Sequence, residues 1–420
     1  MHHLIFPLRF LLLVVLSVPS LALGASPIQE RADRFLKLAN AGYQALFRVN
    51  SETQWLAVTN VTPEHDAAAE ATGKAYAAFN GNPAIISEAR DLLVHQNELN
   101  ELTVRQLKQL LLNAAEGPMT NPDLVAKRVA AETKQASIMN SFEFKLDGHK
   151  ITANEIDDKL EKSADLGERK AVWEDQNGLS RRPSAHHELG HGYYFKAYTR
   201  PEVPYLLRIG AAPGFHEGVG ELIALASSQV PYLQSRGVLP ADFKPDKTAF
   251  LLDDALARSV PFIYFSCGVM PHWEADIYAH NLPPDQWNAR WWKYVSDFQG
   301  IEPPSPRGEE FCDAATKTHI NDNPAYYYNY AFATVFKFQL HDYIARKILH
   351  QPPQSCNYAD NKEVGTWLNN ILQKGGTEDW RRVLKEATGE DISTRAMADY
   401  FKPLMSWVEE QNKGRQIGWE

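Results

Sequence analysis

The chain has 420 residues, of which 44% are hydrophobic and 11% aromatic, so it can bury a large core. Its formal net charge of −9 disfavours nucleic acid and acidic membrane surfaces as partners. The three cysteines, Cys267, Cys312 and Cys356, are too few for a disulfide-rich scaffold. In an oxidising compartment one disulfide is possible, and Cys312 with Cys356 is the pair that we expect.

Residues 1–24 resemble a secretory signal peptide. A weakly basic start precedes an apolar stretch over residues 10–18, and small residues then lead to a cleavage point after Gly24. A membrane anchor is the alternative, but Arg9 and the flanking prolines leave an apolar run that is short for a bilayer. We therefore expect an exported protein, periplasmic or secreted and without a stable membrane anchor, in which residues 25–420 form a single helical domain.

Helical periodicity dominates the N-terminal part. An apolar stripe with three-to-four spacing predicts a first helix and is formed by Ile28, Ala32, Phe35, Leu36, Ala39, Tyr43, Leu46 and Phe47. A second stripe is formed by Leu99, Leu102, Leu107, Leu110 and Leu111. Farther along, residues 152–155 and 165–168 each pair a capping side chain with a glutamate three residues on, as at helix starts.

One hairpin and two late helices complete the prediction. In FEFKLDGHKIT the dipeptide Asp147-Gly148 suits a tight turn between short strands. The segment TEDWRRVLKEATG predicts a helix closed by Gly389, and STRAMADYFKPLMSWVEEQN predicts another. The fold class expected is therefore mostly α, with at most a small β-hairpin.

The segment SAHHELGHGYYF, residues 184–195, contains the pattern H-E-x-x-H. Residues four apart share one face of a helix, so His187 and His191 can present two imidazoles to one metal ion. Glu188 lies beside them and can reach a metal-bound water without being a ligand. Two ordinary helix-surface histidines are the alternative reading.

A pair of glutamates follows in a second motif, FHEGVGELIAL. On a helix, Glu217 and Glu221 would share one face. Catalytic zinc commonly takes two histidines and a carboxylate, which makes Glu217 the natural third ligand. Glu221 could then accept a hydrogen bond from a ligating imidazole. His216 is the rival ligand, although it points about 100° away from that face.

Together these motifs resemble the angiotensin-converting-enzyme-like peptidyl-dipeptidases, in what looks like a bacterial member. HHELGH, APGFHEGVGELIALA, NARWWKYVSDFQGIEPPSPRGEEF, ATKTHINDNPAYYYNYAFATVFKFQLH and ADYFKPLMSWVEEQN carry the resemblance. It covers nearly all of residues 185–420 and, more loosely, residues 28–177. The resemblance implies an elongated, two-lobed helical body with a central cleft.

The resemblance also implies one Zn²⁺ per chain on His187, His191 and Glu217, with Glu188 as the general base. Transition-state donors downstream would be His319 and Tyr330.

This segment is one residue longer than the family pattern, so Tyr328 stays open as the tyrosine donor. Without the resemblance, the four tyrosines over residues 326–330 would indicate aromatic helix packing. Lys317 and Tyr327 match family positions that bind the C-terminal carboxylate of a peptide.

Two departures from the family pattern stand out. Val295 and Asn329 occupy positions where animal members carry chloride-binding arginines, which argues against activation by chloride. A long helical region that precedes H-E-x-x-H in the family is missing, and the chain reaches the motif through LSRRPS, with the seam near residues 178–184. The missing region would form one side of the cleft and supply a carboxylate-binding side chain.

A second metal cluster is conceivable in PHWEADIYAH, formed by His272, Glu274, Asp276 and His280, but solvated helix polarity explains these residues as well. The function expected is an exported zinc metallopeptidase that releases dipeptides from peptide C-termini. The alternatives are a carboxypeptidase that releases single residues and a zinc-binding but catalytically weak truncated remnant. Peptides are the expected partners.

Overall fold

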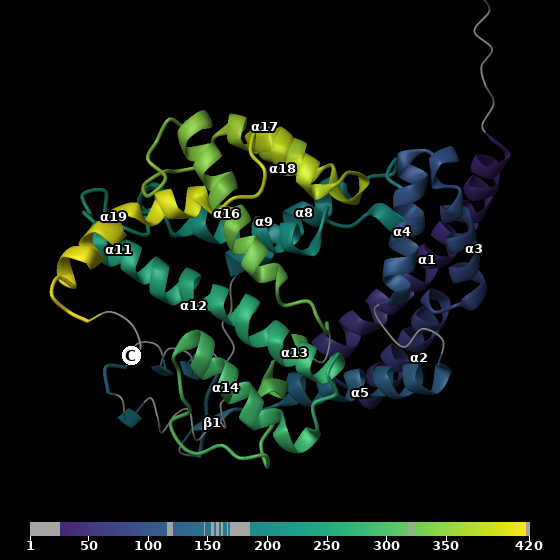
Figure 1. Ribbon diagram of the computed structural model, residues 1–420, viewed down its shortest axis with the longest axis horizontal. Coiled ribbons are helices and arrows are strands. Elements are labelled where there is room, and N and C mark those ends of the chain that lie inside the picture. Colours follow the sequence, from purple (N-terminus) through teal and green to yellow (C-terminus); the bar gives the residue numbers. More distant parts are fainter. Residues whose placement is uncertain are drawn as a thin grey trace, which may run out of the picture.

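The computed structural model describes residues 26–115, 121–146, 148–152, 155–156, 159–160, 163–165, 167–168, 185–317, 319–320 and 323–416. Helices dominate these residues, as predicted (Figure 1). They are α1 (Pro27–Thr59), α2 (Pro63–Asn80), α3 (Pro83–Val94), α4 (Glu101–Ala115), α5 (Pro122–Ser141), α8 (Ala185–Tyr198), α9 (Pro213–Ser228), α10 (Val230–Ser235), α11 (Lys247–Asp253), α12 (Val260–Ile263), α13 (Met270–Tyr278), α14 (Trp287–Gln299), α16 (Asn329–Tyr343), α17 (Lys362–Leu372), α18 (Trp380–Thr388) and α19 (Arg395–Gln411).

Helices α1 to α5 form an N-terminal bundle. Four of them begin with a capping side chain followed directly by proline, at Ser26, Thr62, Asn82 and Asn121. The cap oxygen accepts a backbone N–H, and proline at the first helical position gives up a donor that would have no partner there. Most of the apolar stripes predicted for the first and fourth of these helices lies in one core, which contains Ala32, Leu36, Ala39, Tyr43, Leu107 and Leu110. Phe47 and Leu102 of the two stripes are instead 40% and 39% exposed.

The predicted hairpin is present as strands β1 (Lys145–Leu146) and β2 (His149–Lys150), paired antiparallel. Gly148 has a φ of 78°, the left-handed conformation that such a turn requires and that glycine adopts at little cost. The predicted cap at Thr152 is also confirmed, because Thr152 Oγ accepts the Glu155 N–H at 3.2 Å while Glu155 Oε2 accepts the Thr152 N–H at 2.8 Å.

The rest of the described chain forms the body, centred on α8, α9 and α16. Their shared core contains Tyr194, Phe215, Leu222, Phe336 and Leu340, all at most 2% exposed. Helices α11, α12 and α13 follow one another through two π-helical turns, and in Figure 1 they form one continuous rod below that centre. Each π-helical turn precedes a proline, where the missing N–H leaves a carbonyl without its usual α-helical donor.

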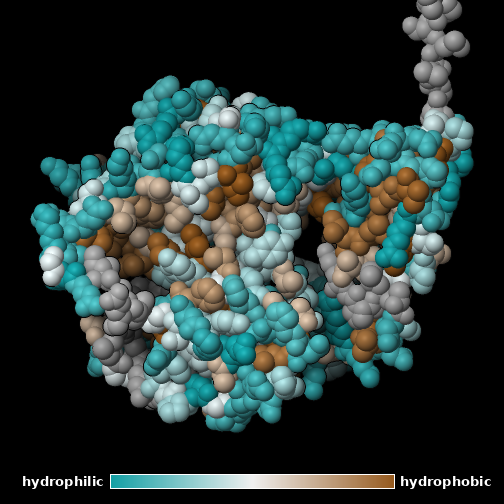
Figure 2. Space-filling view, in the orientation of Figure 1, coloured by the Kyte–Doolittle hydropathy of each residue, from teal (hydrophilic) through white to brown (hydrophobic). Residues whose placement is uncertain are grey.

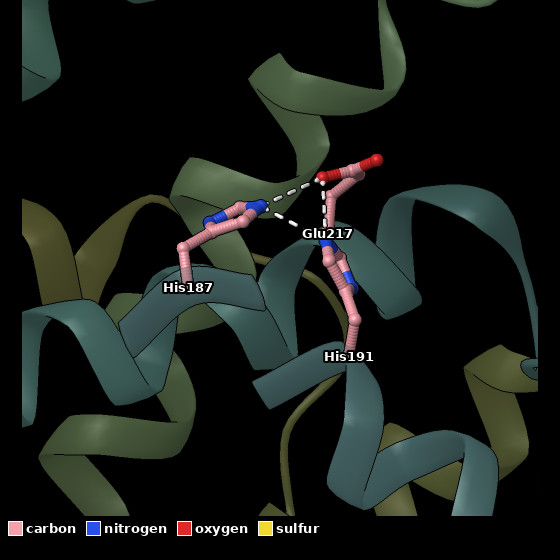
Figure 3. A group of neighbouring side chains, drawn as sticks. All are labelled: His187, His191 and Glu217. Carbon is pink, nitrogen blue, oxygen red and sulfur yellow. Dashed lines mark hydrogen bonds and ion pairs between the residues drawn. The ribbon is translucent and has the colours of Figure 1, made fainter. Parts of the chain in front are cut away.

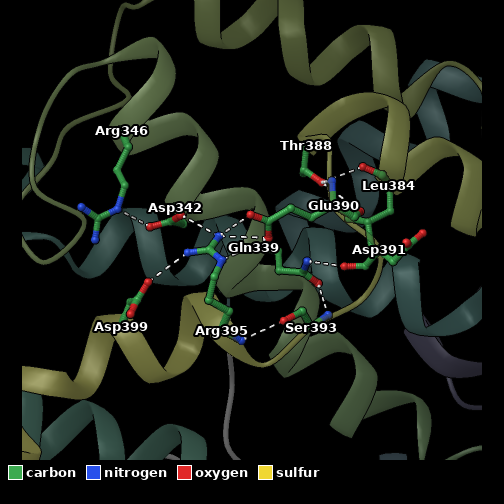
Figure 4. A network of polar contacts seen from close by, with 10 residues as sticks. All are labelled: Gln339, Asp342, Arg346, Leu384, Thr388, Glu390, Asp391, Ser393, Arg395 and Asp399. Carbon is green, nitrogen blue, oxygen red and sulfur yellow. Dashed lines mark hydrogen bonds and ion pairs between the residues drawn. The ribbon is translucent and has the colours of Figure 1, made fainter.

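A polar network ties the far end of α16 to the predicted C-terminal helices α18 and α19 (Figure 4). Arg395, the first residue of α19, pairs with Asp342, Glu390 and Asp399. Gln339 of α16 donates to the Asp391 carbonyl and accepts the Ser393 N–H. Gly389, at a φ of 81°, closes α18 as the sequence predicts. The network fixes α16 at the end opposite the residues that line the site.

The N-terminal bundle and the body form two lobes, and Figure 2 shows the surface hollowed between them. The lobes are joined where Arg105 of α4 donates to the carbonyls of Gly376 and Glu378, and where the Leu206 N–H donates to Asn40 of α1. The mostly α, two-lobed architecture with one small hairpin is therefore confirmed.

Two predicted features lie outside the described residues, namely the signal peptide at 1–24 and the seam at 178–184. Within the described part of the chain, no helix combines the length and the apolar character needed to cross a membrane.

The expected disulfide is wrong. All three cysteines are free; Cys312 is exposed, whereas Cys356 is buried with its sulfur 3.8 Å from Nε2 of His341. Burial raises the pKa of the Cys356 thiol to about 12, which keeps it protonated. In this structure the two sulfurs are therefore not bonded to each other.

Candidate metal centre

Two helices cross closely enough to bring the two sequence motifs together. A β-carbon built on Gly190 of α8 would lie 2.8 Å from the α-carbon of Gly220 of α9. Side chains at these positions would hold the helix axes farther apart. H-E-x-x-H lies on α8, and the glutamate pair Glu217 and Glu221 lies on α9. The glycine contact therefore places the two motifs against each other.

Three predicted ligands converge at this crossing (Figure 3). The Nε2 atoms of His187 and His191 are 2.9 Å apart. Oε2 of Glu217 lies 3.3 Å from the first of these atoms and 3.5 Å from the second. Within the described residues, these three form a group of donor side chains that could hold a metal ion.

The donor set fits a zinc ion. Bonds of about 2.1 Å in a tetrahedral arrangement separate neighbouring ligand atoms by roughly 3.4 Å, close to the distances found here. Oε2 of Glu217 is buried, and among the described residues it has no hydrogen-bond partner, which is costly for a carboxylate oxygen unless a cation faces it. Two imidazole nitrogens and one carboxylate oxygen are also the donor types of catalytic zinc sites.

Carboxylates surround His187 on both sides. Its Nδ1 lies 3.3 Å from Oε1 of Glu221, whose Oε2 accepts from the buried ammonium of Lys337 at 3.0 Å. Burial disfavours the charged imidazole, but Glu217 and Glu221 outweigh it and raise the pKa of His187 to about 9. The contact with Glu221 is made through Nδ1, so Nε2 is the nitrogen of His187 that faces the site.

His216, the rival ligand, does not join the three donor atoms. Its Nδ1 lies 2.7 Å from Nδ1 of His191, on the side of that ring away from Glu217, and its Nε2 lies 3.2 Å from the hydroxyl of Tyr198. Burial and the neighbouring His191 lower the pKa of His216 to about 4. The prediction that His216 points away from the ligand face agrees with this arrangement.

Glu188, the predicted general base, is exposed on α8 beside the ligands. Leu189 and Tyr193 on the same helix are 56% and 64% exposed. One side of α8 therefore faces solvent, and Glu188 lies on this side of the helix, one residue after the ligand His187.

The predicted transition-state donors lie together next to the ligands. Nε2 of His319 is 3.0 Å from the hydroxyl of Tyr330, and Nδ1 of His319 is buried and has no hydrogen-bond partner among the described residues. Burial lowers the pKa of His319, with Lys317 adding to the effect, and burial with nearby Glu217 raises the pKa of Tyr330. At neutral pH both groups are therefore uncharged hydrogen-bond donors.

Tyr328, the alternative to Tyr330, is 46% exposed and contacts Phe332. The Tyr330 hydroxyl is instead within hydrogen-bond distance of His319, which favours Tyr330 over Tyr328 for the predicted role.

Lys317 and Tyr327 are brought together as well. The Lys317 ammonium lies 5.5 Å from the centre of the Tyr327 ring and 5.3 Å from that of Phe265. Tyr327 is only 4% exposed and its ring meets that of His319 at 4.9 Å, so the lysine and the donor pair belong to one aromatic cluster.

The second cluster considered in the sequence does not form a metal site. Asp276 accepts hydrogen bonds from Arg290, Tyr294 and His280, and His272 makes its contact with the Gly268 carbonyl at 2.6 Å. Glu274 accepts the Ala325 N–H at 2.7 Å. Helix polarity therefore explains these residues.

Two contributors were not predicted from the sequence. Tyr326 donates to Oε1 of Glu217 at 2.8 Å, and Lys337 holds Glu221. Tyr326 lies in a run of tyrosines, and their spacing in the sequence does not show which of them pack and which donate hydrogen bonds. Lys337 lies in an apolar stretch of α16 and is 2% exposed. A lysine in an apolar stretch could have predicted a buried acidic partner, because a lysine is almost never fully buried without one.

Comparison with known proteins matches this site and its surroundings to one family. The family model described as Peptidase M2, angiotensin-converting enzyme, matches residues 179–419. The angiotensin-converting enzymes of Mesocricetus auratus and Theromyzon tessulatum are 34% and 33% identical over 248 and 241 residues, and the angiotensin-converting enzyme-like protein Ace3 of Mus musculus is 36% identical over 242.

These alignments cover 57%, 56% and 56% of this chain but only 18%, 38% and 32% of the three relatives, in the same order. The chain thus spans well under half the length of the curated relatives it matches. Because the family model covers more than half of the 420 residues, including every predicted ligand, the chain belongs to the angiotensin-converting enzyme family, Peptidase M2.

Proposed function

We propose that this chain is a zinc metallopeptidase that hydrolyses peptide bonds near the C-terminus of peptides and releases dipeptides. One observation carries the proposal. The Nε2 atoms of His187 and His191 and the buried Oε2 of Glu217 converge within bonding range of one ion, in a member of a peptidase family. Residues 1–24 lead us to propose further that the protein acts outside the cytoplasm.

A bound zinc ion would supply a Lewis acid and a water molecule of lowered pKa. With that group bound, Glu188 would be the general base, whose carboxylate accepts a proton from the attacking water and passes it to the leaving amine. Its exposed position on α8 leaves the carboxylate free to move between these two tasks. His187, His191 and Glu217 would hold the ion and take no part in proton transfer.

His319 and Tyr330 stabilise the negative charge on the peptide oxygen. With a proton on Nε2, His319 donates to Tyr330 over 3.0 Å and leaves the tyrosine O–H to donate to the oxyanion. The raised pKa of Tyr330 keeps this proton in place at neutral pH. The donor is oriented before the reaction begins, because the histidine, the tyrosine and Tyr327 pack against one another.

Preference for a C-terminus would come from Lys317. Its ammonium lies at the aromatic cluster that holds the donor pair, so a substrate carboxylate bound there would set the distance to the cleaved bond. The same geometry also fits a carboxypeptidase that releases single residues. The length of the released fragment distinguishes this activity from the release of dipeptides.

A zinc-binding chain with weak catalysis is the second candidate. The exposure of Leu189 and Tyr193 on α8 favours it, because apolar side chains beside a catalytic centre are ordinarily covered and a covered site excludes water.

The test begins with metal analysis of the purified protein, for which we expect one zinc per chain. Glu217→Ala should lose the metal, whereas Glu188→Gln should keep it and lose turnover, because an amide cannot take a proton from water. Mass spectrometry of the products should show dipeptides. Zinc bound without any product would instead support the weakly catalytic candidate, and loss of zinc in Glu188→Gln would contradict the assignment of that residue as the base.

A further inference from the structure

His216 is a buried histidine next to the metal centre to which the proposed mechanism gives no role. It lies on α9 directly before Glu217, yet its ring is turned toward α8 rather than toward the ligand atoms. Its two nitrogens contact His191 Nδ1 at 2.7 Å and the Tyr198 hydroxyl at 3.2 Å. Both neighbours are on α8, so the ring joins the two helices that build the centre.

The protons in this chain of contacts can be assigned from the metal centre. A neutral imidazole has one N–H and one lone pair, and binding a metal through Nε2 of His191 needs the lone pair there. The His191 proton is therefore on Nδ1 and points at His216. Two facing N–H groups would repel each other at 2.7 Å, so Nδ1 of His216 must be the acceptor. Its own proton is then on Nε2 and is donated to Tyr198.

The surroundings hold the His216 ring in this orientation. The rings of Tyr194 and Phe195 both have their centres 4.7 Å from that of His216. A β-carbon at Gly210 would lie 2.9 Å from Cδ2 of His216, so the glycine leaves room for the ring. Tyr194 is itself fixed, because its hydroxyl accepts the Ala211 N–H at 2.9 Å.

We propose that His216 is a positioning residue of the metal centre, which accepts the Nδ1 proton of His191 and so presents the Nε2 lone pair of His191 to the ion. Tyr198 completes the chain by accepting from His216. The inference rests on the proposed function, since it needs a metal at the centre. The two ligating histidines are then supported differently, His187 by the Glu221 carboxylate and His191 by an uncharged ring.

Two substitutions at one position separate this role from simple packing. His216→Asn places an amide oxygen close to the position of Nδ1 and keeps the acceptor. His216→Leu has a similar volume and suits the aromatic surroundings, but it offers no acceptor. Zinc affinity is measured by competition with a chelator, together with the absorption spectrum of the cobalt-substituted protein. We expect His216→Leu to bind zinc about 10- to 100-fold more weakly and His216→Asn to stay within a few-fold of the wild type.

Tyr198→Phe, which keeps the ring and removes the hydroxyl, should weaken binding by a smaller factor. It should also shift the exchangeable Nδ1 proton of His191 in the NMR spectrum of the zinc-loaded chain, because the acceptor ring loses its partner. That signal keeps the test decisive even if His216→Leu fails to fold.

The possible outcomes distinguish the inference from the metal centre itself. A wild-type chain that binds no zinc overturns the centre, and the inference falls with it. A wild type that binds zinc while His216→Leu binds as tightly, or while His216→Asn is the weaker of the two, overturns the inference alone. An unchanged His191 signal in zinc-loaded Tyr198→Phe overturns the proton assignment.

Discussion

Gly190 of α8 and Gly220 of α9 meet with almost no space between them, since a β-carbon on the first would lie 2.8 Å from the α-carbon of the second. The other side of Gly220 faces the His187 ring, which a β-carbon at Gly220 would approach to between 2.9 and 3.0 Å. The absence of two side chains thus determines the distance between the metal-binding motifs.

Gly220→Ala should weaken metal binding. The new methyl group must push either the His187 ring or α8 away, and overpacking of this kind costs about 1–3 kcal/mol. Gly192→Ala is the matched control, because this exposed α8 position has nothing within 4 Å of a β-carbon and alanine should stabilise the helix by about 0.5–1 kcal/mol. Zinc titration and thermal unfolding of both variants test the prediction, which fails if the two bind zinc equally well.

Tyr326→Phe should lower zinc affinity by about 10-fold, within the range expected for loss of a group that orients a ligand. The variant removes the hydroxyl that donates to Oε1 of Glu217 at 2.8 Å and leaves the ring in place. Tyr328→Phe provides the control from the same segment, since Tyr328 is 46% exposed. Chelator competition measures both, and a normal affinity in Tyr326→Phe would show that the hydrogen bond does not hold Glu217.

Blocking the C-terminus of a substrate as an amide should lower kcat/KM by roughly 10- to 150-fold, the value of one charge-assisted hydrogen bond of about 1.5–3 kcal/mol. Lys317→Met should lose the same factor on the free acid and little on the amide. Because this contact is expected to persist unchanged into the transition state, the effect should fall on KM. Equal cleavage of acid and amide, with internal bonds cut, would instead indicate an endopeptidase.

Stability should fall on acidification through the protonation of His341. This ring is 0% exposed, it lies 2.6 Å from the Pro353 carbonyl through Nε2, and burial lowers its pKa to about 4 from 6.5. Between these two values the unfolded chain binds the extra proton and the folded chain does not, so stability rises with pH over this window. The contribution lost between pH 6.5 and pH 4 is on the order of 3 kcal/mol.

Urea unfolding at several pH values from 4 to 7 measures this dependence. In His341→Gln the slope should be shallower than in the wild type, whatever the absolute stability. His149→Gln, which removes an exposed histidine of β2, should keep the wild-type slope. Identical slopes in all three proteins would count against the assignment to His341.

Local patterns in the sequence were sufficient for several elements of the fold and for the ligands on each helix. Thr152 and Glu155 form the predicted cap, Gly148 has the left-handed conformation of the predicted turn, and Gly389 closes a helix as predicted. Each of these features depends on neighbouring residues alone. In the same way, the four-residue spacing of His187 and His191 determines that both rings leave one face of α8.

Tertiary structure decided which residues of other helices contact the ligands and the groups around them. Three contacts depend on how closely separate helices pack. They are those of Tyr326 with Glu217, of Lys337 with Glu221 and of His216 with His191. The expected pairing of Cys312 with Cys356 failed for the same reason, since the number of cysteines says nothing about which ones are buried. A helical repeat sets the direction of a side chain, whereas the distance between two helices is set by the residues at their crossing, here Gly190 and Gly220.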